Sequence, residues 1–160
     1  MKFQAKNARS AMKKIKLRIK TNVESGSKKH SQSFIKHFQT KLINGDFTPR
    51  LKKSTIRNKR SKGFDLPETP LYGRGKRVKS SLINGLQAFK TAQGMWRIRP
   101  IGKHKTMSMA KLFAIHEYGA LLKNGGKIPA RKPISRSVKS YKQTTEYKNL
   151  NLSISKGLTR

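Results

Sequence analysis

The sequence predicts an α+β fold, in which an antiparallel sheet is packed by one long helix and several short helices. This prediction rests on apolar residues at helical spacing in the first third of the chain and on two strand-like runs near its middle. We expect a basic N-terminal helix or arm over residues 1–25, an α+β domain over residues 26–149 and an extended C-terminal arm over residues 150–160. A chain of 160 residues has room for a single domain of this kind.

The first 23 residues are predicted to form a basic helix. Its apolar residues recur every three or four positions and form one stripe: Ala8, Met12, Ile15, Ile19 and Val23. Its cationic residues include Lys13, Lys14, Lys16, Arg18 and Lys20. This basic helix has two interpretations: it is a peripheral helix with a solvated face, or it is an arm that faces DNA or an acidic partner. The segment Glu24-Ser25-Gly26-Ser27 is predicted to end this helix.

A second helix is predicted to carry the main core stripe. Its apolar positions are Phe34, Ile35, Phe38, Leu42 and Ile43. The pair Asn44-Gly45 is a typical stop signal for a helix.

Residues 46–79 are poor in apolar side chains and rich in Pro and Gly, so we expect a long loop. Ser54-Thr55 could start a short helix within it. The cations of this loop that we expect to face DNA or an acidic partner are Lys52, Lys53, Arg57, Lys59 and Arg60. A long basic loop inside a small domain is typically functional or disordered. Gly73-Arg74-Gly75 is too short for a phosphate-binding fingerprint and is interpreted as a turn.

Two runs, residues 82–91 and 95–101, predict a β-hairpin that turns at Ala92-Gln93-Gly94. Trp96 and Ile98 alternate with Arg97 and Arg99, which indicates one packed face and one solvated face. The sheet is therefore expected to be antiparallel.

The last third of the chain predicts further short elements. A helix marked by Met109, Leu112, Phe113 and His116 is expected to stop at Gly119. Residues 128–134 must be extended because Pro129 and Pro133 bias their predecessors away from helix. Ser135 is expected to cap another helix, with Val138 and Tyr141 pointing inward. Finally, Leu150, Leu152 and Ile154 alternate with polar residues and predict a strand able to pair with a neighbouring chain.

Composition excludes several classes of protein. The chain has no Cys, which removes disulfides, thiolate nucleophiles and Cys-based metal sites. No apolar run is long enough to span a membrane, and the basic N-terminus lacks the apolar stretch of a secretory signal. His116-Glu117 fails the metalloprotease pattern because Ala120 stands where a second His is needed. We therefore expect neither an enzyme nor a bound cofactor or metal.

Charge is the dominant feature, because 39 Lys and Arg against 6 Asp and Glu leave a net charge of +33. Leu, Ile, Val and Phe make up about 22% of the chain, just above the roughly 20% below which highly charged chains stay disordered. Self-repulsion and a thin core make the isolated protein marginal. An anionic partner, or an assembly that shares buried surface, is therefore implied.

Four segments in order resemble the tail-completion, or virion-morphogenesis, family of tailed bacteriophages. They are residues 51–59, residues 70–82, Leu112-Phe113-Ala114-Ile115-His116-Glu117-Tyr118-Gly119, and Ile128-Pro129-Ala130-Arg131-Lys132-Pro133-Ile134. The last two, an "aromatic-Ala-x-x-His-Glu-aromatic-Gly" helix followed by "Ile-Pro-Ala-Arg-x-Pro", form the more specific pair. The resemblance covers roughly residues 34–140. The chain differs from the family pattern in Tyr72-Gly73-Arg74-Gly75 and in Ile134, which leaves the neck station open between completion, terminator and adaptor-side ring.

This resemblance implies a structural virion protein that forms a ring in the phage neck, six-fold or else twelve-fold. Such a ring completes the tail, joins it to the head and surrounds the DNA passage. The resemblance implies that the following residues fix the fold or the subunit contact: His116, Glu117, Tyr118, Gly119, Pro129, Ala130, Arg131 and Pro133. Other phage neck and tail proteins would be its partners, with assembly in the host cytoplasm. We also expect Glu117 to pair with Arg131, since Arg forks suit carboxylates.

Two other functions fit the composition. An RNA-binding structural protein of ribosomal type would share the size, the charge and the absence of Cys. A basic nuclease would need carboxylates to hold a metal ion, and only six carboxylates exist.

Overall fold

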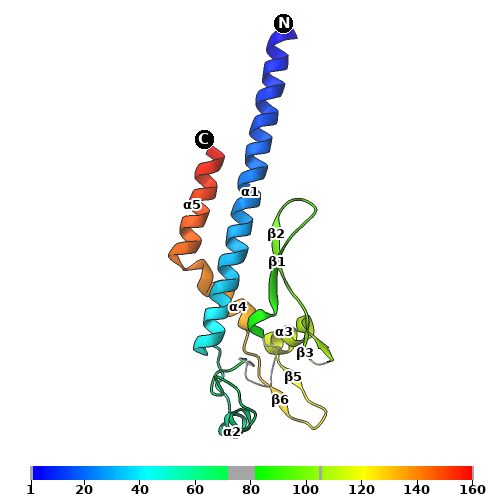
Figure 1. Cartoon of the computed structure of the whole chain (residues 1–160), viewed down its shortest axis with the longest axis vertical. Coiled ribbons are helices and arrows are strands. Elements are labelled where there is room, and N and C mark those ends of the chain that lie inside the picture. The colour runs from blue at the N-terminus through cyan, green and yellow to red at the C-terminus, as the bar shows by residue number, and fades with distance from the viewer. Residues whose placement is uncertain (1, 72–81, 105, 160) are drawn as a thin grey trace.

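A single long helix, α1 (Lys2–Asn44), forms the axis of the molecule in the computed structural model (Figure 1). The structure describes residues 2–71, 82–104 and 106–159, with side chains placed for residues 8–71, 82–104 and 106–156. At about 1.5 Å per residue, α1 spans about 65 Å. The predicted turn at Gly73-Arg74-Gly75 lies outside the described residues.

The other elements follow in chain order and confirm the α+β prediction. The helices are α2 (Lys53–Ser61), the 3-10 turn η1 (Leu82–Asn84), α3 (Met109–Tyr118), α4 (Pro133–Lys142) and α5 (Thr145–Thr159). The strands are β1 (Leu86–Lys90), β2 (Trp96–Pro100), β3 (Lys103–His104), β4 (Met107–Ser108), β5 (Ala120–Leu121) and β6 (Lys127–Ile128). In the described part of the chain the strands form three separate two-stranded antiparallel ladders, β1–β2, β3–β4 and β5–β6.

The predicted helix break at residues 24–27 is wrong, because α1 runs through it. The hydroxyls of Ser25 and Ser27 donate to the carbonyls of Asn22 and Glu24 within the helix, so they do not end it. The stop at Gly45 is confirmed, since this glycine has a φ of +72° just after the last helical residue.

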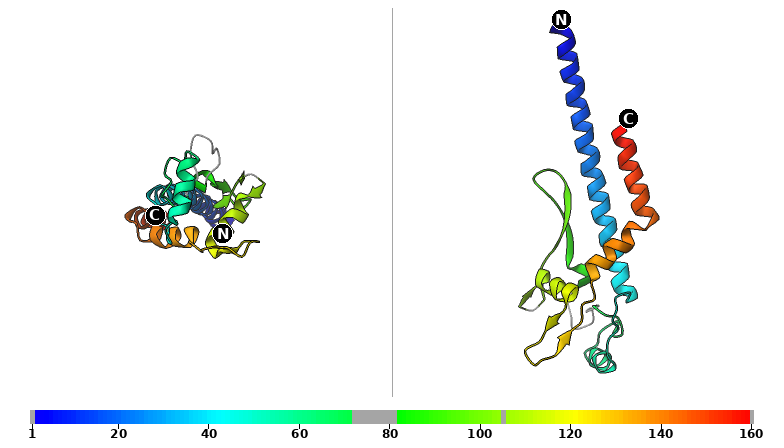
Figure 2. Two further views of the ribbon diagram at one scale, coloured as in Figure 1. Left: turned by 90° about the horizontal axis from the view of Figure 1, so that it is seen from below. Right: turned by 180° about the vertical axis from the view of Figure 1, so that it is seen from behind.

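The predicted hairpin is confirmed. β1 and β2 pair with Phe89 opposite Arg97, and Trp96 and Ile98 are half-buried while Arg97 and Arg99 are exposed. The hairpin lies along one side of α1 and α5 along the other, so the long helix separates them (Figure 2).

The core gathers around the C-terminal half of α1. Phe38 is fully buried, with its ring centroid 6.3 Å from that of Phe47 and 5.8 Å from that of Phe113. Tyr141 of α4 is buried against Phe34, as predicted. Two predicted core positions are wrong: Ile43 and Val138 are 45% and 37% exposed. By contrast, every residue of α1 between 8 and 21 is exposed.

The predicted C-terminal strand is wrong, because residues 150–154 lie within the helix α5. Leu150 and Ile154 are also four residues apart, which is helical spacing. Together with Tyr147 they are half-buried in a helix that packs against α1, while Leu152 is 57% exposed. Strand addition to a neighbouring chain is therefore not available to this segment.

Gly26 decides how closely α5 packs on α1, because a Cβ there would lie 2.4 Å from Cδ1 of Ile154. We predict that Gly26→Leu reduces the hydrogen-exchange protection of α5, although it raises the intrinsic helix propensity of α1 by about 1 kcal/mol. Ser25→Leu, at an exposed neighbouring position, is the control and should leave α5 protected. Unchanged protection in Gly26→Leu would contradict this packing.

Candidate functional site

The His-Glu-Tyr-Gly motif at the end of α3 builds the start of α4. Glu117 is 8% exposed, and its carboxylate accepts hydrogen bonds from the backbone N–H groups of Ile134 at 2.9 Å and Ser135 at 3.1 Å, and from the Ser135 hydroxyl. Ser135 was predicted to cap α4 but lies inside it, and Lys132, at the N-cap position, supplies no side-chain cap of its own. Glu117 therefore caps α4 from a different helix and places a negative charge at its N-terminus.

The expected ion pair between Glu117 and Arg131 is wrong. The oxygens of Glu117 are occupied by the first turn of α4, and Arg131 instead donates from Nε to the carbonyl of Pro49 at 3.2 Å. Arg131 is 7% exposed, and this burial lowers its pKa. Its role is to hold the chain that follows α1 against the segment before α4.

The segment between α3 and α4 is fixed by backbone contacts. The carbonyl of His116 accepts from the N–H groups of Arg131 at 2.8 Å and Lys132 at 3.1 Å. Gly119 has a φ of +80°, and a Cβ there would lie 2.9 Å from the carbonyl oxygen of Ile128. Glycine is therefore required where α3 turns into β5. Residues 133 and 134 were predicted to be extended but begin α4, where Pro133 is fully buried at the position that suits a proline.

His116 is held in its neutral form. Burial and the nearby Arg131 lower the pKa of its imidazole to about 4. In the described part of the chain, no three His, Cys, Asp or Glu side chains gather where they could hold a metal ion. The hydrogen bonds of Glu117, Arg131 and the His116 carbonyl form a junction between α3, α4 and the chain that follows α1.

The same junction carries an exposed apolar edge. Tyr118 and Leu121 are 81% and 75% exposed and Leu122 is 45% exposed. We call these three residues the hairpin edge, because Leu121 lies in β5 and Tyr118 and Leu122 lie on either side of this strand in the chain. Among the predicted motif residues, Pro129 is exposed beside them and Ala130 is half-buried. Exposed large apolar side chains that cluster on a protein surface mark contact sites. The hairpin edge was not predicted from the sequence, although two adjacent leucines before a Gly-rich turn indicate an exposed apolar site.

The predicted basic residues form two separate surfaces. Lys13, Lys14, Lys16, Arg18 and Lys20 lie on the free part of α1, whereas α2 lies at the opposite end of the long axis (Figure 1). At the α2 end Lys52, Lys53 and Arg57 are exposed. Lys59 differs, because its Nζ donates to the carbonyl of Thr69 at 2.8 Å and burial, with Arg131 nearby, lowers its pKa to about 8. Arg60 forms an ion pair with Glu68.

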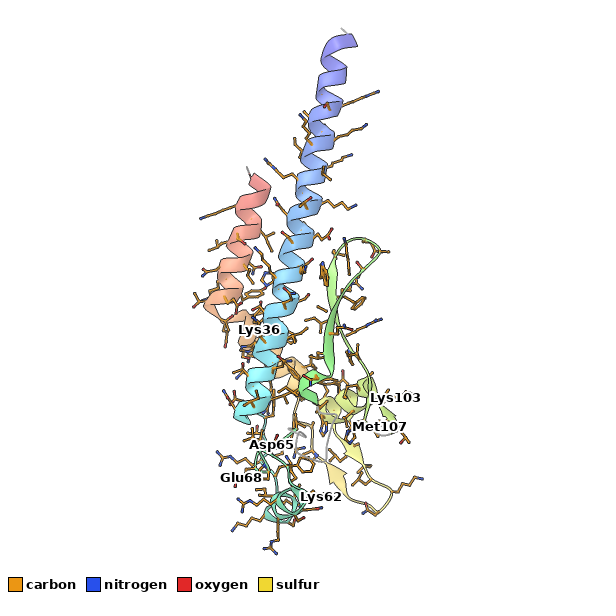
Figure 3. All side chains as sticks on the ribbon, viewed as in Figure 1. Lys36, Lys62, Asp65, Glu68, Lys103 and Met107 are labelled. Carbon is orange, nitrogen blue, oxygen red and sulfur yellow. The ribbon has the colours of Figure 1, made fainter. Side chains whose placement is uncertain are left out.

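Most of the carboxylates are already used inside the molecule. Glu24 pairs with Lys90, Asp46 pairs with Lys41 at 3.0 Å, and Glu68 pairs with Arg60 at the α2 end, where Asp65 also lies (Figure 3). Since Glu117 caps α4, Asp65 and Glu146 are the two of the six for which the described part of the chain shows neither an ion pair nor a helix cap. The cations of the chain therefore far outnumber the carboxylates that could balance them.

Comparisons with protein-family models, with curated proteins and with solved structures found no match. None of the helices in the described ranges combines the length and the apolar character needed to cross a bilayer.

We predict that Glu117→Ala lowers the free energy of unfolding by about 1–3 kcal/mol, because it leaves the N–H groups of Ile134 and Ser135 without their acceptor. Glu117→Gln keeps an acceptor oxygen and should cost less. Urea unfolding followed by circular dichroism measures both, with Glu146→Ala as a control at an exposed carboxylate. Recovery of stability in the double reversal Glu117→Arg with Arg131→Glu would contradict this assignment.

His116 should make stability depend on pH. Its folded pKa of about 4 lies below its ordinary value of 6.5, so the unfolded chain binds the proton more readily between these values. The contribution of neutral His116 is present above about pH 6.5 and is lost as the pH falls toward 4. From pH 7 to 4.5, we expect the wild type to lose about 1–2 kcal/mol more than His116→Gln. Equal losses would contradict a buried neutral imidazole.

Proposed function

We propose that this protein is a structural component of a tailed-bacteriophage virion that forms an oligomeric ring in the neck. The ring would complete the tail, join it to the head and surround the DNA passage. The observation that carries this proposal is the junction of α3 and α4. The two motifs that resemble the tail-completion family, residues 112–119 and 128–134, meet there through Glu117 and the His116 carbonyl.

The hairpin edge supports an assembly role. Tyr118, Leu121 and Leu122 project from a junction whose backbone is fixed at Gly119, so the edge is presented in a defined position. An apolar hollow of about 350 Å³ lies between α1, the β1–β2 hairpin and α4, lined in part by Leu86, Ile98 and Val138. An apolar edge and an apolar hollow on one small chain suit contacts between neighbouring copies in a closed ring. We favour a six-fold ring, with a twelve-fold ring as the alternative.

The charge supports the passage of DNA. A ring built from many copies of a +33 chain would hold a high density of cations around its lumen. Such cations attract phosphates through counterion release and need no sequence recognition. The protein would act by shape and electrostatics, without catalysis or a cofactor, next to other neck and tail proteins in the virion. Before that it would be assembled in the host cytoplasm.

We predict that nuclease-treated protein forms discrete rings, and that Leu121→Ser with Leu122→Ser reduces them to smaller species. Sedimentation velocity and negative-stain images at two salt concentrations measure this, because salt screens repulsion between copies. Leu152→Ser, at an exposed leucine of α5, is the matched control and should leave the rings intact.

The rival function gives a different result. An RNA-binding protein of ribosomal type would lose its order once nuclease removes the nucleic acid, and its state would not depend on the hairpin edge. Absence of any discrete oligomer under both salt conditions would contradict the neck proposal.

A further inference from the structure

We infer that the free part of α1, residues 8–23, is a docking helix for another protein. Its partner surface would be a groove with an apolar floor and a rim of Asp and Glu side chains. This inference concerns a surface separate from the hairpin edge, and it does not rest on the neck function.

The apolar side of this helix is largely exposed, and at its C-terminal end Ile19 and Val23 line a hollow with Gly94 and Met95 of the β1–β2 turn. Met12, Ile15 and Ile19 are 58%, 48% and 40% exposed. At about 100° per residue these three and Ala8 fall within a sector of about 60°. Exposed large apolar residues aligned in this way are typical of a helix that lays one side into a groove.

The apolar stripe lies on the same side of α1 as the contact with α5. Gly26, which contacts Ile154 of α5, lies five helical turns after Ala8 and so faces the same direction. α1 extends well beyond the end of α5 (Figure 2), and its residues 8–21 are all exposed. This side of α1 therefore binds a helix, α5, along its C-terminal part, and the N-terminal part of the same side is exposed.

Cations flank the stripe on both sides. By the same helical geometry, Lys13, Lys16 and Lys20 lie on one side and Lys14 and Arg18 on the other. No Asp or Glu occurs between residues 8 and 23. Lys14 and Arg18, like Lys16 and Lys20, are like charges four residues apart, which destabilises a bare helix. Carboxylates on both walls of a groove would relieve this repulsion.

The same charges exclude a second copy as the occupant. The chain has six carboxylates and four of them are engaged within the described residues, so a second copy offers too few to form an acidic rim. Nucleic acid would use the cations but would leave the apolar stripe without a partner. A membrane surface is disfavoured because residues 8–23 hold no aromatic residue and the exposed Leu17 lies on the side opposite the stripe.

A designed peptide tests the inference with the full-length protein. The probe is a fluorescent helical peptide with Leu at heptad positions a and d and Glu at e and g, where the glutamates discourage self-association. A second peptide with Ser in place of Leu keeps the charge and removes the apolar floor. We expect fluorescence anisotropy to show binding of the first peptide at least about tenfold tighter than the second.

Variants of the protein separate the two contributions. The stripe variant Met12→Gln, Ile15→Gln and Ile19→Gln should weaken binding of the Leu peptide by about tenfold or more, and so should the charge variant Lys13→Gln, Lys16→Gln and Arg18→Gln. Leu152→Gln, an exposed apolar control on α5, should change nothing. Glutamine is a good helix former, and circular dichroism checks that α1 is retained.

Two results would overturn the inference. Equal binding of the two peptides, or unchanged binding by the stripe variant, would show that α1 attracts polyanions by charge alone. Stripe-dependent binding to vesicles of phosphatidylcholine and phosphatidylglycerol, with no binding of the Leu peptide, would show a membrane-surface helix instead.

Discussion

The interaction on which the rest of the structure depends is the repulsion among 39 cationic side chains that share only six carboxylates. The molecule uses these carboxylates at particular points. Glu24 and Asp46 pair with lysines at opposite ends of the packed half of α1, and Glu117 caps α4. Exposed cations are dense at the free end of α1 and around α2, and others, such as Arg97, Lys111 and Lys139, are spread over the remaining elements. The packed core gathers around the C-terminal half of α1, and both ends of the molecule carry dense, exposed positive charge.

The α3–α4 junction shows how a few residues define the shape of a thinly packed chain. Glu117 joins two helices, Gly119 admits the close approach of β6, and Arg131 ties the segment that follows α1 to the same place. Their shared effect is to fix the position of Tyr118 and Leu121, which are exposed in the single chain. This links the His-Glu-Tyr-Gly motif at the end of α3 to an exposed apolar surface.

The sequence was informative wherever spacing and punctuation act locally. The stripe around Phe38, the hairpin and the helix that ends at Gly119 were predicted because periodicity and stop signals need no knowledge of distant contacts. The errors share one cause, which is a tertiary contact. Gly26 favoured a helix break on local grounds, but in the structure α1 continues through it and α5 packs against it. Leu150 and Ile154 fit helical and strand spacing equally well, and packing against α1 favours the helix. Glu117 was assigned to Arg131 by charge, but the bare N-terminus of α4 was the stronger demand.

The free energy of unfolding as a function of sodium chloride concentration tests the central claim most directly. If uncompensated repulsion opposes the compact state, the free energy of unfolding must rise as salt screens the cations. At low salt, short duplex DNA must also raise the free energy of unfolding above its value without DNA. A chain whose stability stayed constant or fell over this range, and did not respond to DNA, would contradict the account.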